Sequence, residues 1–303
     1  MKILLIIILS TTFLISCVEK DNSIDENFKK CVDELDLPAE EVTEIRCRFR
    51  DIKDISGISS YINLETLDIE GNEVTDITPL QNTKGILHLD LSGNPITNYS
   101  ILKDLPALES ISVSSFNLEF IKLISSIGSL KSISLEDSEL TEEMVDELEN
   151  LSNLRILHLK SNNFVVFPDL SGFPSLIYLT LSNEDSLTDT GNIKLLTSLQ
   201  YLTLNNIEIS DISFIASLLD LEQLVINDMN NINLEVINSH PNLSVLDIYN
   251  SSLLGDVNLL ITSPSLESIK LFNISTLTCE DAAKLEDTFG EIYFEHHDSL
   301  QCI

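Results

Sequence analysis

The side chains in this sequence that could perform chemistry are its five histidines, its five cysteines and its many carboxylates. One local cluster, the sequence EHHD from Glu295 to Asp298, has residue types that bind metal ions. Neighbouring residues on a strand point to opposite faces, so this spacing favours a polar edge of the fold, with a metal site as the weaker alternative. The sequence contains no glycine-rich phosphate loop, no HExxH motif and no GxSxG motif. We therefore expect no catalytic residues, no metal and no cofactor.

The chain is strongly acidic: 49 Asp and Glu residues outnumber 17 Lys and Arg residues, which gives its 303 residues a formal net charge of −32. Phosphate binding needs clustered Lys and Arg, so nucleic acid is excluded as a partner, and the surface would repel anionic lipid headgroups. Solubility is the simplest reason for the acidity, and a cationic or calcium-bearing partner is the alternative. With 43% hydrophobic residues and no tryptophan, the chain can bury a large aliphatic core.

The first sixteen residues are typical of a signal peptide. Lys2 precedes an apolar stretch, residues 3–15, that is shorter than the ~20 residues a membrane-spanning helix needs. The sequence LISC, which ends at Cys17, resembles the bacterial lipobox, and this resemblance implies cleavage before Cys17 and lipid on its sulfur and new amine. A generic signal peptide or a buried strand is the alternative. Residues 1–16 are thus a predicted lipoprotein signal peptide, and residues 17–30 the lipidated cysteine with a polar tether.

A repeating pattern occupies almost all of the remaining chain. LETLDIEGNEV from Leu64, ILHLDLSGNPI from Ile86 and LRILHLKSNNF from Leu154 share the pattern LxxLxLxxNxL. Weaker copies recur every 22 to 24 residues, beginning at Val42, Leu108, Leu130, Leu176, Leu199, Leu221, Leu243 and Leu266. The chain resembles leucine-rich repeat proteins, in the short 22-residue style of the internalins. The resemblance implies an α/β solenoid of eleven repeats over residues 42–288: a horseshoe with a parallel concave β-sheet of about twelve strands and short irregular or helical convex segments.

Each repeat can be numbered from its first residue. Side chains at positions four and six should point into the core, and those at positions three, five and seven should line the concave face. The longest repeat has Met144, Leu148 and Leu151 at helical spacing after Thr141, which predicts one convex-side helix. Most of the later repeats lack asparagine at position nine, so we expect less regular turns there. In three repeats this asparagine can satisfy backbone groups of the turn after the strand: Asn72, Asn94 and Asn162.

Four cysteines remain once Cys17 is assigned to lipid, two near each end of the repeats. An open solenoid needs capped ends, and exported chains meet oxidising conditions. Four cysteines allow three connectivities, but two of these would join the ends of a stack that twelve strands make roughly 50 Å long. Zinc binding is the competing interpretation, although neither pair has CxxC spacing. We predict an N-terminal cap at residues 31–50 and a C-terminal cap with a closing strand at residues 279–303, held by the disulfides Cys31–Cys47 and Cys279–Cys302.

Charged residues gather at the outward positions of the first repeats. Arg48 of the first repeat neighbours Asp68 and Glu70 of the second, which favours a salt bridge that supports the N-terminal cap. Asp68 and Asp90 are like charges side by side, and a bound cation would relieve their repulsion. Whether a cation binds there stays open.

Large apolar side chains gather at the outward positions of the later repeats. Tyrosine and phenylalanine offer a large contact area at a low cost in conformational entropy, as in binding hot spots. Strands favour aromatic residues in any case, and columns of them stabilise a sheet, so a structural role is the alternative. The predicted partner-binding residues, called the concave patch below, are Ile156, Tyr178, Tyr201, Val225, Val245, Tyr249 and Phe272.

These features together predict a monomeric, lipid-anchored protein-binding module of the bacterial cell envelope, which is not an enzyme. Internalin-type proteins use the concave face for host receptors, so the resemblance extends the expectation to adhesion. The alternative is a periplasmic or envelope scaffold that binds another envelope protein, and a ligand sensor or enzyme is more remote. Val18, and not aspartate, follows Cys17, which favours the outer membrane over the inner one.

Overall fold

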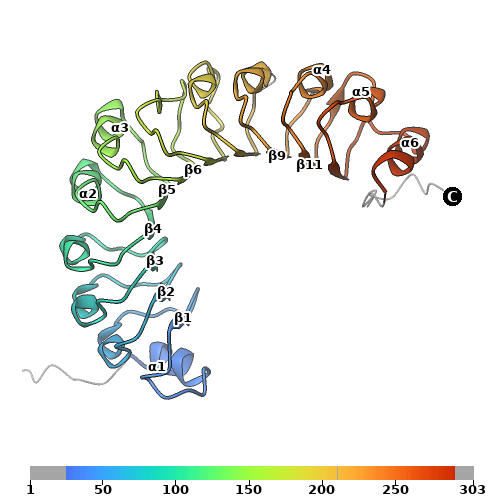
Figure 1. Cartoon of the computed structure of the whole chain (residues 1–303). Helices are drawn as coiled ribbons and strands as arrows, with labels where there is room; N and C mark the ends of the chain where they lie inside the picture. The colour runs from blue at the N-terminus through green and yellow to red at the C-terminus, as the bar shows by residue number, and fades with distance from the viewer. Residues whose placement is uncertain (1–24, 210, 291–303) are drawn as a thin grey trace, which may run out of the picture.

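The computed structural model describes residues 25–209 and 211–290. The chain coils into an open arc, with parallel strands along its inner side and helices and loops along its outer side (Figure 1). Each repeat contributes one strand and one outer segment, so neighbouring repeats bury their aliphatic side chains against each other in one continuous core. The predicted leucine-rich repeat horseshoe is confirmed.

Within the described residues, eleven strands form one parallel sheet whose order follows the chain. Each strand begins at position three of its repeat, so the predicted frame is confirmed in all eleven repeats. The predicted closing strand lies outside the described residues. The strands are β1 (Glu44–Arg46), β2 (Thr66–Asp68), β3 (His88–Asp90), β4 (Ser110–Ser114), β5 (Ser132–Glu136), β6 (Ile156–Lys160), β7 (Tyr178–Ser182), β8 (Tyr201–Asn205), β9 (Gln223–Asn227), β11 (Val245–Tyr249) and β13 (Ser268–Phe272).

Burial alternates along these strands as the repeat pattern requires. In β4, for example, Ile111 and Val113 are fully buried, while the serines on either side of them are half-buried. Fully burying a side chain of this size contributes about 1.5–3 kcal/mol, so a one-residue shift of register would expose a row of them at high cost. A separate two-stranded parallel sheet, β10 (Ile232–Asn233) with β12 (Leu253–Leu254), was not predicted.

The outer segments contain short helices. The helix predicted after Thr141 is α3, and the Thr141 hydroxyl accepts a hydrogen bond from the Met144 N–H at 3.4 Å. Convex helices also form in repeats where the sequence did not single one out: Asn117 and Asn233 cap α2 and α4 in the same way. The helices are α2 (Leu118–Ile124), α3 (Glu142–Leu148), α4 (Leu234–Asn238) and α5 (Asn258–Ile261), and the 3-10 turns are η1 (Ser56–Ser60), η2 (Thr78–Asn82), η3 (Ser100–Asp104), η4 (Ile193–Leu195) and η5 (Ser213–Ser217).

Helix α1 (Glu26–Asp33) covers the N-terminal end of the core. Its N-cap residue, Asp25, accepts hydrogen bonds from the N–H groups of Asn27 and Phe28, and also from the Lys53 N–H at 3.0 Å. Phe28 is fully buried. The prediction of a polar tether through residue 30 is therefore wrong from Asp25 onward, because one capping carboxylate and one buried ring suffice to fold this polar segment onto the first repeat.

A disulfide joins Cys31 of α1 to Cys47 after β1, with the Cα atoms 5.9 Å apart. This is the N-terminal pair that the sequence predicts, and it fastens the capping helix to the first repeat. At the other end, helix α6 (Cys279–Phe289) begins with a capping box between Thr278 and Asp281. Cys302 lies outside the described residues, so its pairing with Cys279 stays a prediction. Within the described residues no helix is long and apolar enough to cross a membrane.

Every repeat leaves its strand through a left-handed residue at position eight. Its φ angle lies between 49° and 68° in all eleven repeats, so at this position the later turns are as regular as the first ones. Glycine, asparagine and aspartate adopt this conformation most readily, which explains their frequency here. The residues are Phe49, Gly71, Gly93, Ser115, Asp137, Ser161, Asn183, Asn206, Asp228, Asn250 and Asn273.

The asparagine at position nine forms hydrogen bonds with backbone groups in the turns of the first repeats. The Asn72 amide oxygen accepts hydrogen bonds from the N–H groups of Arg50 and Ile52 in the preceding repeat, both at 3.0 Å. Its amide nitrogen donates to the carbonyl oxygens of Cys47 and Ile69 at 2.7 and 2.8 Å. One buried side chain thereby satisfies four backbone groups of two neighbouring repeats.

Candidate functional site on the concave face

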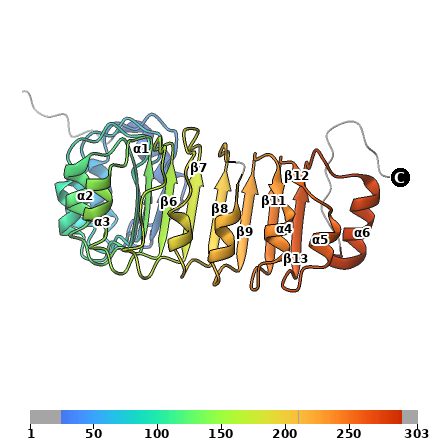
Figure 2. The ribbon, with the colours of Figure 1, turned by 90° about the horizontal axis from the view of Figure 1, so that it is seen from above.

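The structure places all seven residues of the concave patch on the inner face of the main sheet. They come from strands β6 to β9, β11 and β13, of which β8, β9, β11 and β13 stand side by side in Figure 2. Each of the seven side chains is half-buried, so each is held by its neighbours and still presents part of its surface. The arrangement that the frame predicts is therefore present, while a partner for it stays a prediction.

An aromatic column lies at position three of the patch. The rings of Tyr178 and Tyr201, on neighbouring strands, stack with their centroids 5.7 Å apart and their planes 21° apart. The His158 ring, at position five of the neighbouring strand β6, has its centroid 5.6 Å from that of Tyr178 and adds a third ring to the column. Burial lowers the pKa of His158, so its imidazole is neutral at pH 7. The column is an uncharged surface made of three rings.

A second aromatic pair lies at position seven, nearer the C-terminal end. The Tyr249 and Phe272 rings have centroids 6.5 Å apart and planes inclined by 47°. Because positions three and seven are at opposite ends of the strands, the two aromatic groups occupy diagonally opposite corners of the patch. Val225 comes from β9, the strand between the two groups, and Val245 comes from β11, the strand that also carries Tyr249. Such ring pairs contribute roughly 0.5–1.5 kcal/mol beyond their buried area, so they also support the sheet.

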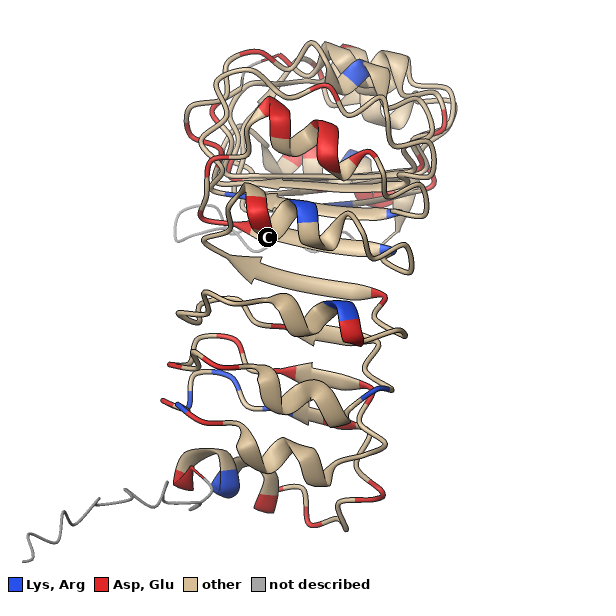
Figure 3. Ribbon diagram, turned by 90° about the vertical axis from the view of Figure 1, so that its left-hand side faces the viewer, with Lys and Arg blue, Asp and Glu red and all other residues tan. Residues whose placement is uncertain are grey.

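Formal charge is scarce in this part of the concave face. At positions three, five and seven from β6 onward, only Lys160, Asp247 and Lys270 are charged, on a chain whose formal net charge is −32. Acidic residues instead occupy many helices and loops of the outer side (Figure 3). Interface cores are depleted of charged residues, so this distribution is typical of a surface that a protein partner covers.

Asp247, in the middle of β11, is the exception. It is only 4% exposed, and the Lys270 ammonium lies 3.4 Å from one of its carboxylate oxygens. The other oxygen, Oδ1, is buried and has no hydrogen-bond partner within the described part of the chain. A buried acceptor without a donor costs about 1–3 kcal/mol, so a donor brought by a partner would be stabilising.

A row of side-chain amides borders the patch at the end of the strands. Asn227 donates to the Asn205 oxygen at 2.7 Å and accepts from the Asn250 amide at 2.9 Å, and Asn273 donates to Asn250 at 2.9 Å. Asn206 donates to Asn183 at 3.0 Å in the same way. These amides, each at least partly exposed, form a polar rim next to the Tyr249 and Phe272 rings.

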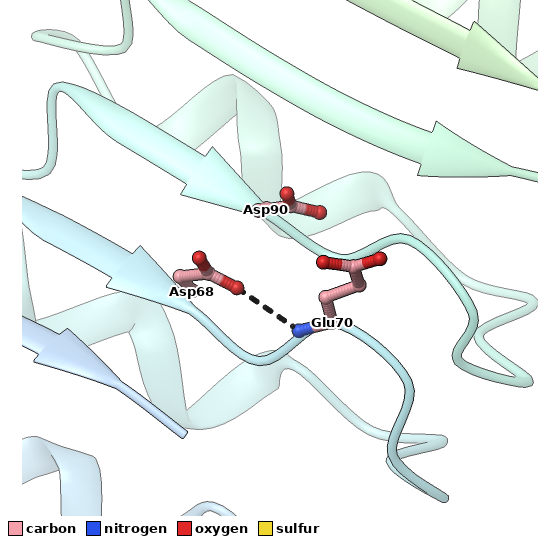
Figure 4. Close-up of side chains that lie close together, drawn as sticks. All are labelled: Asp68, Glu70 and Asp90. Atoms are coloured by element: carbon pink, nitrogen blue, oxygen red, sulfur yellow. Dashed lines mark hydrogen bonds between the residues drawn. The ribbon is translucent and has the colours of Figure 1, made fainter. Parts of the chain in front are cut away.

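The other notable site is an acidic cluster on the first repeats, formed by Asp68, Glu70 and Asp90 (Figure 4). One carboxylate oxygen from each residue lies within 4.8 Å of the others. Asp68 and Asp90 are directly opposite on β2 and β3, and burial, helped by the charge of Asp68, raises the pKa of Asp90. Arg48 forms the predicted salt bridge: its Nε lies 2.5 Å from Asp68 and its Nη1 3.2 Å from Glu70.

Known structures share this architecture, although no family model and no curated protein matches the sequence. An internalin from Listeria monocytogenes, InlF, is similar over 91% of this chain and 96% of its own, with 17% identity and a TM-score of 0.57. A leucine-rich repeat protein from Leptospira interrogans is similar over 84% of this chain and 72% of its own, with 19% identity and a TM-score of 0.53. The chain has the leucine-rich repeat fold of the internalins. At these identities the likeness concerns the fold, so the site is argued from this chain's own residues.

Two features of this leucine-rich repeat face were not predicted. The amide rim is encoded by asparagine at positions seven and eight of the repeat frame, whereas the pattern LxxLxLxxNxL specifies asparagine only at position nine. The buried Asp247 occupies position five, which the frame expects to be outward and solvated. Because the sheet is concave at this face, side chains of neighbouring strands come close together. The short side chain of Asp247 lies between Val225 and Lys270 and is thereby covered.

Proposed function

We propose that the chain is a lipid-anchored protein-binding module of the bacterial cell envelope, which holds a protein partner on the concave patch. One observation carries this proposal: half-exposed aromatic and aliphatic side chains share a nearly uncharged surface on an otherwise strongly acidic molecule. Solvation alone gives no reason to place them there, whereas a partner that buries them gains contact area.

The surroundings of the patch support a protein as the partner. Protein interfaces combine a buried apolar centre with a polar, hydrogen-bonding rim, and here Val225 and Val245 accompany two aromatic groups beside the amide rim. The free oxygen of Asp247 adds a hydrogen-bond acceptor inside this area. We expect the partner to place an N–H or O–H donor against it, with Lys270 moving aside.

The anchor is proposed from the LISC sequence, because Cys17 lies outside the described residues. Lipid on Cys17 would leave the capping helix α1 nearest the membrane and the concave patch further along the solenoid. Several acyl chains on one cysteine would hold the protein stably where a single chain would not. Val18 after the cysteine supports the outer membrane as the destination.

Binding through the patch is tested by replacing Tyr178, Tyr201 and Tyr249 together by serine. Partner capture, measured by cross-linking the full-length protein in intact cells, should fall at least tenfold while circular dichroism shows an unchanged fold. A matched control replaces Leu195 and Leu219, two exposed leucines on η4 and on the loop after η5, by serine and should capture normally. Equal capture by the tyrosine variant and the native chain would place the interface elsewhere.

Adhesion and an internal scaffold role differ in which side of the outer membrane displays the protein. Adhesion requires that protease added to whole cells cleaves the chain. A chain that stays intact until the outer membrane is permeabilised serves as a periplasmic scaffold, and the adhesion function is then wrong while partner binding stands.

A further inference from the structure

We propose that the partner inserts an arginine side chain into the concave patch, where its guanidinium group binds the carboxylate of Asp247. This inference rests on the proposed function and names the chemistry of the partner at the same surface. Asp247 lies at position five of β11, with Val225 directly opposite on β9 and Lys270 directly opposite on β13. Residues of the concave patch therefore surround this carboxylate on its own strand and on both neighbouring strands.

The carboxylate of Asp247 is buried and only partly satisfied. The residue is 4% exposed, and its Oδ2 lies 3.4 Å from the Lys270 ammonium. Its other oxygen, Oδ1, is buried and has no hydrogen-bond donor among the residues that the structure describes. Buried polar atoms are normally hydrogen-bonded, so a donor supplied by a ligand would complete this site.

Lys270 is the neighbour that can give a ligand access to Asp247. Its side chain is 53% exposed, and a lysine ammonium is carried on a flexible four-carbon stem. Val225, on the other side, has a stiff β-branched side chain and stays in place. A movement of Lys270 toward solvent would open both carboxylate oxygens to a guanidinium, which can donate two parallel hydrogen bonds to one carboxylate.

The charge of this part of the chain favours a cationic ligand. From Tyr201, where β8 begins, to Phe272, where β13 ends, the sequence contains nine Asp and Glu residues and a single Lys or Arg residue, Lys270. Because Lys270 pairs with Asp247, the other acidic residues leave this half of the solenoid strongly negative. Such a surface attracts a basic partner and steers it toward the patch.

An arginine suits the site better than a lysine. A guanidinium is planar, stacks on aromatic rings and is more weakly hydrated than an ammonium, so it loses less hydration on burial. Tyr249 lies two residues after Asp247 on the same face of β11, and its ring pairs with that of Phe272. Burial raises the pKa of Tyr249 and the charge of Asp247 adds to this effect, so the carboxylate acts on the ring at close range. A guanidinium on Asp247 therefore has an aromatic surface beside it.

Peptides that differ at one position test the nature of the ligand. The full-length protein in detergent is mixed with three peptide pools, in which random residues flank a central arginine, lysine or citrulline. Citrulline has the shape of arginine without its charge, and the lysine pool measures general attraction to the acidic chain. Mass spectrometry should find the arginine pool retained at least tenfold more than the citrulline pool and at least threefold more than the lysine pool. Equal retention of the three pools, or retention of none, would overturn the proposal.

Variants test whether the arginine binds at Asp247. Asp247→Asn keeps the size of the side chain and removes its charge, so retention of the arginine pool should fall at least tenfold. Glu222→Gln is the matched control, because it removes one negative charge from an exposed residue of the neighbouring repeat, outside the concave patch. It should retain the arginine pool as the native chain does. Equal losses in the two variants would mean that general acidity attracts the peptides, and the proposal is then wrong.

Lys270→Met gives an independent test, which also decides the question if circular dichroism shows that Asp247→Asn is misfolded. Since Lys270 competes with the arginine for Asp247, this change should increase retention of the arginine pool at least threefold. Unchanged or weaker retention by the folded variant would contradict the proposal.

Partner capture in intact cells separates this inference from the proposed function. Asp247→Asn should capture the partner at least tenfold less than the native chain does. If it captures normally while the triple tyrosine variant does not, the concave patch is the interface and the arginine inference alone is wrong. If the triple tyrosine variant also captures normally, the proposed function is wrong as well.

Discussion

Glu184 accepts a hydrogen bond from the backbone N–H of Asn162 at 2.9 Å, in the place that asparagine occupies in the first repeats. Its carboxylate also lies 3.4 Å from the Phe164 N–H. These are the two donors, at positions nine and eleven of the preceding repeat, that correspond to Arg50 and Ile52 above Asn72. Glu184 is fully buried, and this burial raises its pKa. Glu184 therefore accepts the two hydrogen bonds that the asparagine accepts, but its carboxylate cannot donate the two that the asparagine donates. It also places an ionisable group in the core.

Replacing Glu184 by asparagine should stabilise the protein by about 1 kcal/mol at pH 7. Asparagine can accept from the same two N–H groups and, unlike glutamate, can donate to the carbonyl oxygens of Leu159 and Leu181. It also removes the cost of a buried charge. Denaturant midpoints of the two proteins measure the difference, and a lower midpoint for the variant would contradict this interpretation.

The gain from Glu184→Asn should depend on pH. A carboxyl group whose pKa is raised in the folded state contributes stability that is present below its unfolded value of 4.5 and is lost as the pH rises through the folded pKa. The advantage of the variant should therefore be largest near pH 7 and shrink as the pH falls toward 4.5. An advantage that is constant over this range would mean that Glu184 is not responsible for it.

His240 should produce the opposite pH dependence. It is 1% exposed, its Nδ1 accepts the Leu243 N–H at 3.0 Å, and its Nε2 lies 3.0 Å from the Leu218 carbonyl oxygen. Burial lowers its pKa below 6.5, so the folded state binds the proton less well than the unfolded state. Stability contributed by the neutral ring is thus present above pH 6.5 and is lost as the pH falls below it. His240→Gln should flatten this part of the profile, measured as the free energy of unfolding at a series of pH values.

Removing the Cys31–Cys47 disulfide should destabilise the protein by about 3 kcal/mol, the value expected for a closed loop of this size. Replacing both cysteines by serine and following chemical unfolding measures the loss. Reductant should destabilise the native chain and have a smaller effect on the double variant. Hydrogen exchange should then show the largest increase in α1, because the disulfide fastens that helix to the first repeat.

Changing Cys17 to serine should abolish incorporation of an alkyne-tagged fatty acid and move the protein from the membrane fraction to the soluble fraction. The change leaves the four other cysteines in place, so the effect of losing Cys17 is separate from any effect of losing a disulfide. Persistent labelling of the variant would show that the LISC sequence is not the lipid attachment site.

The periodic part of the fold was predictable because each repeat contains leucines at fixed spacing, which sets the strand frame residue by residue. Departures arise where one short polar side chain decides the local structure. Asp25 turns part of an apparent tether into the capping helix α1, and Asn117 caps a helix that periodicity alone does not reveal. Such caps depend on single hydrogen bonds, which a hydrophobic pattern does not register.

For the candidate site, the frame predicts which side chains share a face but not how deeply each is covered. Tyr178 and Tyr201 are neighbours by repeat length alone, and their stacking follows from it. The burial of Asp247 and Glu184 depends on the size of residues one repeat away and on the curvature of the sheet. These contacts emerge only when the repeats are stacked.

Photo-cross-linking in living cells tests the central proposal most directly, with a photoreactive residue placed at Thr203, inside the concave patch, or at Leu219, on the loop after η5. The account predicts one discrete protein adduct from position 203, lost when Tyr178, Tyr201 and Tyr249 are replaced by serine, and no such adduct from position 219. An adduct from position 219 alone, or one from position 203 that survives the triple replacement, would contradict it.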